Sequence, residues 1–290
     1  MNPEVMSFHD PATATFTYVV YDHAGGHAAV VDPVLDYDPA SARTWTASAE
    51  RVLDFVREQR LTVDWILETH AHADHLTAAA FLKGETGAPV AIGRGILQVQ
   101  ARFKALFGLG EEFTADGSQF DRLFVDGERF RIGALQARVI ATPGHTDDGL
   151  TYLIGDAAFV GDTVLAPDVG TARADFPGGD ARELYRSIRK LFDLGQDTRL
   201  FLCHDYPPDQ RAPRAQTSLD EQRLHNVHVG GPADEDSFVQ VRTRRDAALP
   251  APKLILPALQ VNIRAGELPP PDANGIRYLR LPLNQGGSPA

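Results

Sequence analysis

The stretch Thr69–His75 restricts the possible folds of this chain more than any other feature of the sequence. It reads THAHADH, so three histidines and one aspartate lie within six residues. Such a density of ligand-type side chains is costly in a hydrophobic core and unusual on a surface. The stretch follows the apolar run Val63–Leu67, which predicts a buried strand. On extended backbone His70 and His72 point to the same side, and the other two ligand types follow at the expected start of a helix.

Three more ligand-type side chains stand just beyond an apolar run that predicts a strand: His145 after 134–141, Asp162 after 157–160 and His204 after 200–203. Loops at strand ends gather on one edge of a layered α/β fold, so residues far apart in sequence converge there. Each residue alone has an ordinary explanation, as a hydrogen-bonded core histidine or a turn cap. Together with Thr69–His75 they make seven nitrogen and oxygen ligands, which predict a site for one or two metal ions.

The composition excludes several classes of partner. With 28 Lys+Arg against 39 Asp+Glu, the formal charge of the 290 residues is −11, and such a surface repels phosphate backbones and anionic lipid headgroups. We therefore expect neither a nucleic-acid nor a membrane partner. A hydrophobic content of 43% with 23% charged residues is typical of a globular protein built as one large domain or as a domain with an extension.

The cysteine content and the first residues bear on the compartment. The single cysteine, Cys203, excludes an intramolecular disulfide and a cysteine-rich zinc site, and we expect it to be a small buried residue. Residues 1–10 carry no cationic stretch followed by an apolar run, and no window of the sequence approaches the roughly 20 apolar residues that span a bilayer. These features predict a cytoplasmic protein.

The hydrophobic pattern alternates between strands and helices, which predicts an α/β fold with sheets covered by helices. Glycine-containing turns predict three hairpins, which pair 16–22 with 27–32, 123–125 with 129–132, and 150–154 with 157–160. Helical spacing predicts helices over 48–60, 75–83 and 180–194. Residues 205–250 are expected to be mainly helical, and 251–290 are rich in proline.

The ordered ligand set His70-x-His72-x-Asp74-His75, with His145, Asp162 and His204 downstream, resembles that of the metallo-β-lactamase superfamily. The match spans about residues 15–205. It implies a four-layer αββα sandwich, with 1–205 as the catalytic core and 206–290 as a helical and proline-rich extension that completes the same domain. Relatives in this superfamily include lactamases, thioesterases, lactonases, nucleases and oxygen reductases, so the pattern alone does not choose the reaction.

Further segments resemble the persulfide dioxygenase branch, the sulfur dioxygenases related to glyoxalase II. The segments that carry this second resemblance are Thr69–Thr77, Thr171–Phe176, Leu184–Ile188, His204–Tyr206 and Asn262–Gly266. In the second of them, TARADF, an alanine stands where the branch's G-R-T-D-F pattern has threonine. The stretch 96–119 and the long tail depart from the shorter members and resemble a larger bacterial subgroup.

The resemblance implies one Fe(II) per chain, bound by His70, His145 and Asp162. Two histidines and a carboxylate on one face leave positions open, as in non-haem iron enzymes that hold a substrate and O₂ together. The implied substrates are glutathione persulfide and O₂, with sulfite and glutathione as products. The branch also suggests a homodimer.

Other residues receive supporting roles from the same resemblance. His72, Asp74, His75 and His204 would orient the metal ligands. Tyr206 would hydrogen-bond a bound sulfur or oxygen, and Arg173 and Arg264 would pair with the carboxylates of glutathione. The alternative for both arginines is a surface salt bridge. We expect Arg242, Arg244 and Arg245 to form a solvated helix face, and the remaining histidines, His9, His23, His27, His225 and His228, to be surface or packing residues.

Two other functions remain open on the sequence. All seven ligands of a two-metal hydrolase are present, with Asp162 able to bridge, which permits a glyoxalase II-type hydrolase of glutathione thioesters. The third possibility is a non-catalytic or nucleic-acid-directed member. The net charge of −11 argues against a nuclease, and the complete ligand set argues against a scaffold that has lost its metal.

Overall fold

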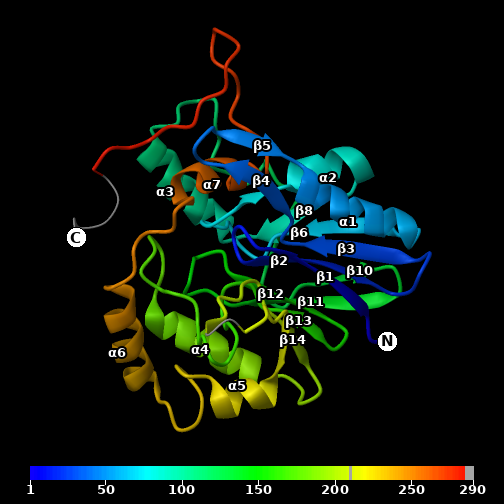
Figure 1. Ribbon diagram of the computed structural model, residues 1–290, viewed down its shortest axis with the longest axis vertical. Helices are drawn as coiled ribbons and strands as arrows, with labels where there is room; N and C mark the ends of the chain where they lie inside the picture. Colours follow the sequence, from blue (N-terminus) through cyan, green and yellow to red (C-terminus); the bar gives the residue numbers. More distant parts are fainter. Residues whose placement is uncertain (209–210, 285–290) are drawn as a thin grey trace.

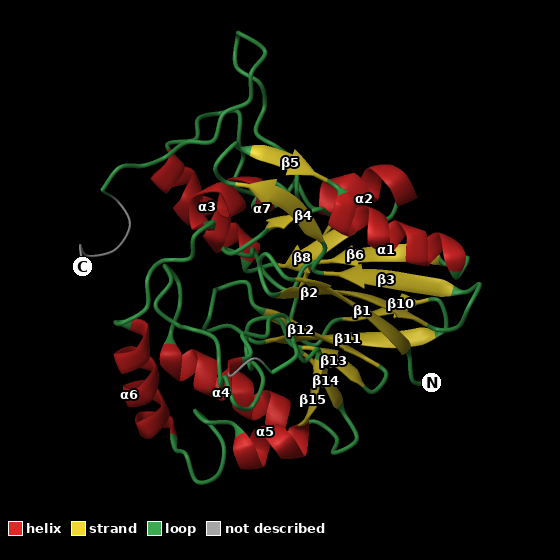
Figure 2. Ribbon diagram, viewed as in Figure 1, coloured by secondary structure: helices red, strands yellow, loops and turns green. Residues whose placement is uncertain are grey.

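The computed structural model describes residues 1–208 and 211–284 of the chain. Two six-stranded sheets lie face to face, and helices cover the outer side of each sheet (Figure 1 and Figure 2). The predicted four-layer αββα arrangement is confirmed. None of the helices in the described part of the chain has both the length and the apolar character needed to cross a bilayer.

The sheets combine antiparallel hairpins with parallel crossovers. The first sheet has the order β1-β2-β3-β6-β8-β9, formed by Glu4–Asp10, Thr15–Tyr21, His27–Val31, Thr62–Leu67, Val90–Gly93 and Arg122–Phe124. The second has the order β10-β11-β12-β13-β14-β15, formed by Arg129–Ile132, Leu135–Ala141, Leu150–Ile154, Ala157–Phe159, Arg199–Phe201 and Gln216–Ser218. A small third sheet, β5-β4-β7, is formed by Arg43–Trp45, Val34–Asp38 and Leu76–Thr77.

Seven helices are present in the described residues. The first sheet is covered by α1 (Ala47–Glu58), α2 (Ala79–Thr86), α3 (Ile96–Phe107) and α7 (Ile255–Asn262), and the second by α4 (Ala181–Phe192), α5 (Leu219–His225) and α6 (Glu235–Asp246) (Figure 2). In α4 the apolar side chains Leu184, Ile188 and Leu191 recur on one face and are fully buried, as their spacing predicts. Asp180 caps this helix by accepting hydrogen bonds from two backbone amides of its first turn.

The central core lies between the two sheets. Tyr18, from the first sheet, packs its ring against Phe159 of the second with the ring centroids 5.3 Å apart, and both side chains are buried. Burial of side chains of this size stabilises the fold by about 1.5–3 kcal/mol each. The buried tyrosine hydroxyl has a hydrogen-bond partner, because it donates to the carbonyl of Ala215 at 2.9 Å.

Two of the three predicted hairpins are confirmed. β2 pairs antiparallel with β3, and β12 with β13. The hairpin predicted around Asp126-Gly127 is wrong, because β9 pairs in parallel with β8 in the first sheet while β10 pairs with β11 in the second. The turn therefore carries the chain from one sheet to the other. A glycine turn signals a reversal of direction, but it does not specify which strands pair across it.

Two helical segments also differ from the sequence expectation. The helix expected from His75 begins only at Ala79, because Leu76 and Thr77 pair with β4 and form the short strand β7. Residues 205–250 contain α5 and α6 as expected, together with the edge strand β15, which pairs with β14. The N-terminal edge strand β1 was not expected from the sequence, because its residues are mostly polar and partly exposed.

Candidate metal centre

The loops that follow four strands bring the predicted ligands to one edge of the sandwich. His70, His145 and Asp162 follow β6, β11 and β13, and their ligand atoms all lie within 4.8 Å of one another. Asp162 Oδ2 is 3.5 Å from His145 Nε2 and 3.9 Å from His70 Nε2. These distances leave a space between the three side chains that suits one ion.

A second group lies beside the first. His72, Asp74, His75 and His204 also bring one ligand atom each to within 4.8 Å of one another. In this group His204 Nε2 is 3.0 Å from Asp74 Oδ2. The same nitrogen is 3.7 Å from Asp162 Oδ1, so the Asp162 carboxylate lies between the two groups. The structure thus brings all seven predicted ligands together as a group of three and a group of four that adjoin, since Asp162 also groups with His204 and the rings of His70 and His72 lie 4.0 Å apart.

The chemistry of these side chains fits a metal ion. Within the described residues, several buried ligand atoms have no hydrogen-bond partner, among them Nε2 of His70 and His75, Nδ1 of His72 and Oδ1 of Asp162. Buried polar atoms without partners are rare and unfavourable, and metal coordination satisfies them. Burial holds the pKa of His70 and His72 well below the ordinary value, and neighbouring histidines add to the effect. Both imidazoles are therefore neutral, as metal ligands must be.

Hydrogen bonds fix the orientation of the histidines. The Thr69 hydroxyl donates to Asp32 Oδ2 at 2.8 Å and therefore accepts from His70 Nδ1 at 3.1 Å, which leaves the lone pair on His70 Nε2. His72 Nε2 donates to Asp32 Oδ1 at 3.0 Å, which leaves the lone pair on Nδ1. His145 Nδ1 donates to the backbone carbonyl of Arg173 at 2.7 Å. In each case the nitrogen left free is the one that faces the centre.

A pocket of about 780 Å³ opens next to the group of three. His145, Asp162 and Tyr206 line it near the metal ligands, and Phe176 and Leu254 provide apolar surface. Another part of its wall carries basic side chains, Arg173, Arg242, Arg245 and Lys253, together with the neutral ring of His228 and the carboxylate of Asp168. Among residues 1–208 and 211–284, neither Arg245 nor Lys253 takes part in an ion pair. In a chain with a formal charge of −11, Arg245 and Lys253 therefore give this wall a local positive charge.

The two arginines proposed as substrate contacts lie in different places. Arg173 lines the pocket, but its guanidinium is paired with both carboxylate oxygens of Asp175 at 2.6 and 2.7 Å. Arg264 is buried, and its guanidinium lies 4.6 Å from the ring centroid of Phe113. It is not one of the described residues that line the pocket. The role of either arginine in substrate binding stays a prediction.

The expectation for Arg242 is wrong. Instead of facing solvent it is only 3% exposed, and it forms an ion pair with Asp246 one turn later on α6. Arg244 and Arg245 are exposed, as expected. Two residues of the site were not predicted from the sequence: Asp32, which orients two ligands, and His228, which lines the pocket. Asp32 follows an apolar strand just as Asp162 does, so the same strand-end rule could have found it.

The chain belongs to the metallo-β-lactamase superfamily, since the family model described as "Metallo-beta-lactamase superfamily" matches residues 10–204. A probable metallo-hydrolase of Burkholderia pseudomallei is 50% identical to it, over 97% of this chain and 99% of that protein. Glyoxylase B2 of Dictyostelium discoideum is 48% identical, over 96% of each chain. The human persulfide dioxygenase ETHE1, mitochondrial, is 29% identical, over 89% of this chain and 86% of that protein.

A solved structure supports the same relationship. The crystal structure of ETHE1 from Myxococcus xanthus superimposes with a TM-score of 0.73 and is 32% identical in sequence, covering 91% of this chain and 100% of that one. The resemblance to the persulfide dioxygenase branch is therefore confirmed, alongside the higher identity to relatives with hydrolase and glyoxylase names.

Proposed function

We propose that this chain is a persulfide dioxygenase with one Fe(II), which converts glutathione persulfide and O₂ to sulfite and glutathione. The observation that carries the proposal is the separation of the ligands into two groups. His70, His145 and Asp162 converge without His72, which is grouped with the other set. Two imidazoles and one carboxylate are the donor set that non-haem Fe(II) oxygenases use. The similarity to two proteins called ETHE1 supports the same branch.

Bound Fe(II) would supply open coordination positions at which the terminal sulfur of the persulfide and O₂ come within bonding reach of each other. The reaction balances as glutathione persulfide plus O₂ and water giving glutathione and sulfurous acid, so the sulfane sulfur supplies the electrons and no external reductant is needed. The contribution of the chain is to hold two imidazoles in fixed tautomers beside one carboxylate and to orient the substrate.

The pocket next to His145 and Asp162 is suited to the glutathione half of such a substrate. Arg245 and Lys253 can pair with carboxylates, and the half-exposed Tyr206 stands at the ligand end of the pocket, with its ring stacked on His204. We therefore expect that changing Arg245 or Lys253 to glutamine raises the KM for glutathione persulfide about 10-fold and leaves kcat and the iron content unchanged. Steady-state kinetics with Arg244→Gln as the matched control check this, because Arg244 lies on the same helix and is not one of the described residues that line the pocket.

A specific observation also favours a second candidate. The group His72, Asp74, His75 and His204 has its own set of ligand atoms, with Asp162 between the two groups. Two ions held in this way would match a glyoxalase II-type hydrolase, in which an activated hydroxide attacks a glutathione thioester. The names of the relatives with about half of their residues identical support this alternative.

Metal analysis combined with an oxygen electrode distinguishes the two functions. The protein is purified without added metal, and its metal content, its O₂ uptake and its hydrolysis of a glutathione thioester are measured. We expect about one iron per chain and O₂ uptake only when persulfide is present. Two zinc ions per chain, or rapid thioester hydrolysis without O₂ uptake, would replace the proposal with the hydrolase.

Single substitutions then assign the ligands. His70→Ala, His145→Ala and Asp162→Ala are each expected to lose iron and activity, because each removes a direct ligand. His204→Ala is expected to keep much of its iron, as measured by iron analysis of the folded variant. Complete loss of iron in His204→Ala would show that the assignment of the two groups is wrong.

We also propose a cytoplasmic homodimer, as the cysteine content and the branch suggest. Light scattering tests the oligomeric state, and cell fractionation tests the location.

A further inference from the structure

Helix α6 carries two buried charges that the metal ligands do not explain. Arg242 and Asp246 are 3% and 4% exposed, and their nearest atoms, Arg242 Nη2 and Asp246 Oδ1, are 2.6 Å apart. Burying an ion pair is favourable only when its remaining donors and acceptors are also satisfied. The partners of those remaining atoms therefore indicate what the pair does.

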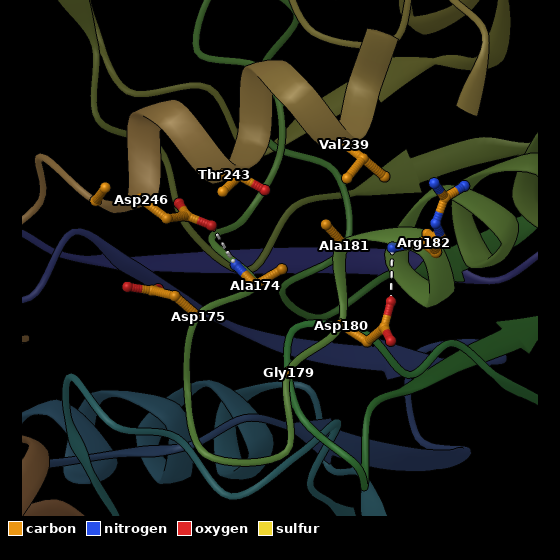
Figure 3. A pocket seen from close by; sticks show the side chains of 10 residues that line it. Ala174, Asp175, Gly179, Asp180, Ala181, Arg182, Val239, Thr243 and Asp246 are labelled. Atoms are coloured by element: carbon orange, nitrogen blue, oxygen red, sulfur yellow. Dashed lines mark hydrogen bonds between the residues drawn. The ribbon is translucent and has the colours of Figure 1, made fainter. Parts of the chain in front are cut away.

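The remaining atoms bind the backbone of the loop that precedes α4. Arg242 Nη1 donates to the carbonyl of Thr171 at 2.9 Å. Asp246 Oδ2 accepts from the amide of Ala174 at 2.9 Å, as Figure 3 shows. The pair thus holds the loop on both sides of Arg173. Arg173 itself donates from Nη1 to the carbonyl of Pro250, just beyond the end of α6.

Packing alone does not fix this loop. A cavity of about 500 Å³, lined by Ala174, Asp175 and Gly179 on one side and by Thr243 and Asp246 of α6 on the other, lies between the loop and the helix (Figure 3). A segment that borders such a space lacks close van der Waals neighbours there. On its other side Ala174 packs in the same buried cluster as Phe238 of α6, and the hydrogen bonds of the ion pair add a directional restraint to that packing.

The carbonyl held between these two anchors contacts a metal ligand. Arg173 O accepts a hydrogen bond from His145 Nδ1 at 2.7 Å. A carbonyl can only accept, so Nδ1 carries the proton and the lone pair is on Nε2, which lies 3.5 Å from Asp162 Oδ2. A shift of this carbonyl would release the imidazole to rotate or to change tautomer.

We propose that Arg242 and Asp246 act as a positioning pair, which sets the tautomer and orientation of His145 by fixing the Thr171–Ala174 backbone. Neither residue hydrogen-bonds a metal ligand, and Arg242, which also lines the pocket, is paired with Asp246 there. The inference holds for a one-ion and for a two-ion centre, because His145 is a ligand in both. The pair is expected to raise the affinity of the centre for metal, and this affinity is measurable without any catalytic assay.

The sharpest variant removes both charges at once. Replacing one partner would leave the other charge buried alone and could unfold the protein, whereas Arg242→Met with Asp246→Leu removes the pair without an orphaned charge. This double variant is expected to fold and to have a dissociation constant for Co(II) about 10- to 100-fold higher, the usual effect of losing an outer partner of a ligand. Competition with a chelator measures the constant. An unchanged constant in the folded variant would overturn the proposal.

An ion pair elsewhere on the same helix provides the control. Arg182 Nη2 pairs with Asp236 Oδ1 at 2.7 Å and links α4 to α6 on the exposed side, without contact to the Thr171–Ala174 backbone. The identical exchange, Arg182→Met with Asp236→Leu, is expected to leave Co(II) affinity unchanged. Equal weakening in both double variants would mean that only the docking of α6 matters, and the specific role of Arg242 and Asp246 would be rejected.

A second readout uses the metal-free protein. Nitrogen-15 NMR of the imidazoles, with the His145 signals assigned from a His145→Gln variant, reports which ring nitrogen carries the proton. We expect the Nδ1-protonated form in the unaltered chain and a mixture of tautomers in the Arg242/Asp246 double variant. If that variant does not fold, Arg242→Lys takes its place, since lysine keeps the charge but lacks the planar fork with which Arg242 binds Asp246 and the Thr171 carbonyl from separate nitrogens. An unchanged His145 tautomer and unchanged Co(II) affinity in Arg242→Lys would also reject the proposal.

Discussion

His228 has a structural task that its position in the sequence does not signal. Its Nδ1 accepts a hydrogen bond from the backbone amide of Thr171 at 3.0 Å, so the ring must be neutral at this nitrogen. Burial, together with the positive charges of Arg242 and Arg245, lowers its pKa from 6.5 to about 4. Protonation of His228 would therefore break this hydrogen bond and create a buried positive charge beside two cations.

This pKa makes the stability of the fold depend on pH in a definite direction. The unfolded chain takes up the His228 proton near pH 6.5 and the folded chain only near pH 4, so acid favours unfolding across this window. Above pH 6.5 the neutral His228 makes its full contribution to the free energy of unfolding. That contribution falls by about 3 kcal/mol as the pH drops through 4. His228→Asn keeps an acceptor for the Thr171 amide but cannot titrate. Urea titrations of both metal-free proteins at several pH values are expected to show a shallower pH dependence for His228→Asn, and equal slopes would contradict this.

The candidate site could be predicted from the sequence only where residue type and position both pointed to it. His145, Asp162 and His204 could be selected because each is a ligand type just past an apolar strand. Arg242 could not be placed, since its spacing of four residues to Asp246 fits a solvated helix face and a buried ion pair equally well. What decides between them is the loop packed against α6, which only the folded chain supplies.

The turn between β11 and His145 is a point of close contact between elements. Gly144 has a φ of +128°, and a Cβ atom at this position would stand 2.2 Å from the backbone nitrogen of Leu184 in α4. Only glycine allows both the dihedral angle and the approach of the helix. The path of the chain from β11 to His145 thus depends on the absence of a side chain at Gly144.

Gly144→Ala is expected to destabilise the protein by about 3 kcal/mol or more, because the methyl group forces the backbone of α4 away. Gly127→Ala is the matched control, since Gly127 also has a positive φ of +77° but has open space around the added carbon. It is expected to lose about 1–2 kcal/mol from the dihedral angle alone and to keep its metal. Urea unfolding and metal analysis check both variants, and equal losses of stability would contradict the steric explanation.

The arrangement of the elements was predictable to the extent that local signals determine it. Gly155-Asp156 joins two strands that are neighbours in the same sheet, so the local turn and the tertiary pairing agree. Asp126-Gly127 gives an equally strong local signal, yet Arg122–Phe124 finds a parallel partner in β8 of the other sheet. Pairing between strands distant in sequence is set by the burial of whole faces, which a turn motif does not report.

The C-terminal part of the chain reaches back to the metal-binding loop. Asn262, at the end of α7, donates to the backbone carbonyls of His72 and His75, both at 2.8 Å, and accepts from the amide of Thr77 at 2.9 Å. These contacts explain physically why an asparagine stands at the start of the Asn262–Gly266 segment. They support the proposal that 206–290 completes the domain formed by 1–205.

Asn262→Ala is expected to lower the free energy of unfolding by about 2–4 kcal/mol and to weaken metal binding, because three buried backbone groups of the loop lose their partner. Gln260 offers a control on the same helix: it is equally buried and makes three hydrogen bonds, but to Leu256 and Arg280. Gln260→Ala is expected to cost similar stability without a change in metal affinity. Denaturant titration and chelator competition measure the two quantities, and normal metal affinity in Asn262→Ala would refute the link.

Cys203, the single thiol of the sequence, is 2% exposed, and burial raises its pKa well above the ordinary value. A protonated, enclosed sulfhydryl is a poor nucleophile. Thiol-alkylating reagents are therefore expected to leave Cys203 of the folded chain unlabelled. Under the proposed function, the same burial would protect the chain from taking a sulfur atom from its substrate onto itself.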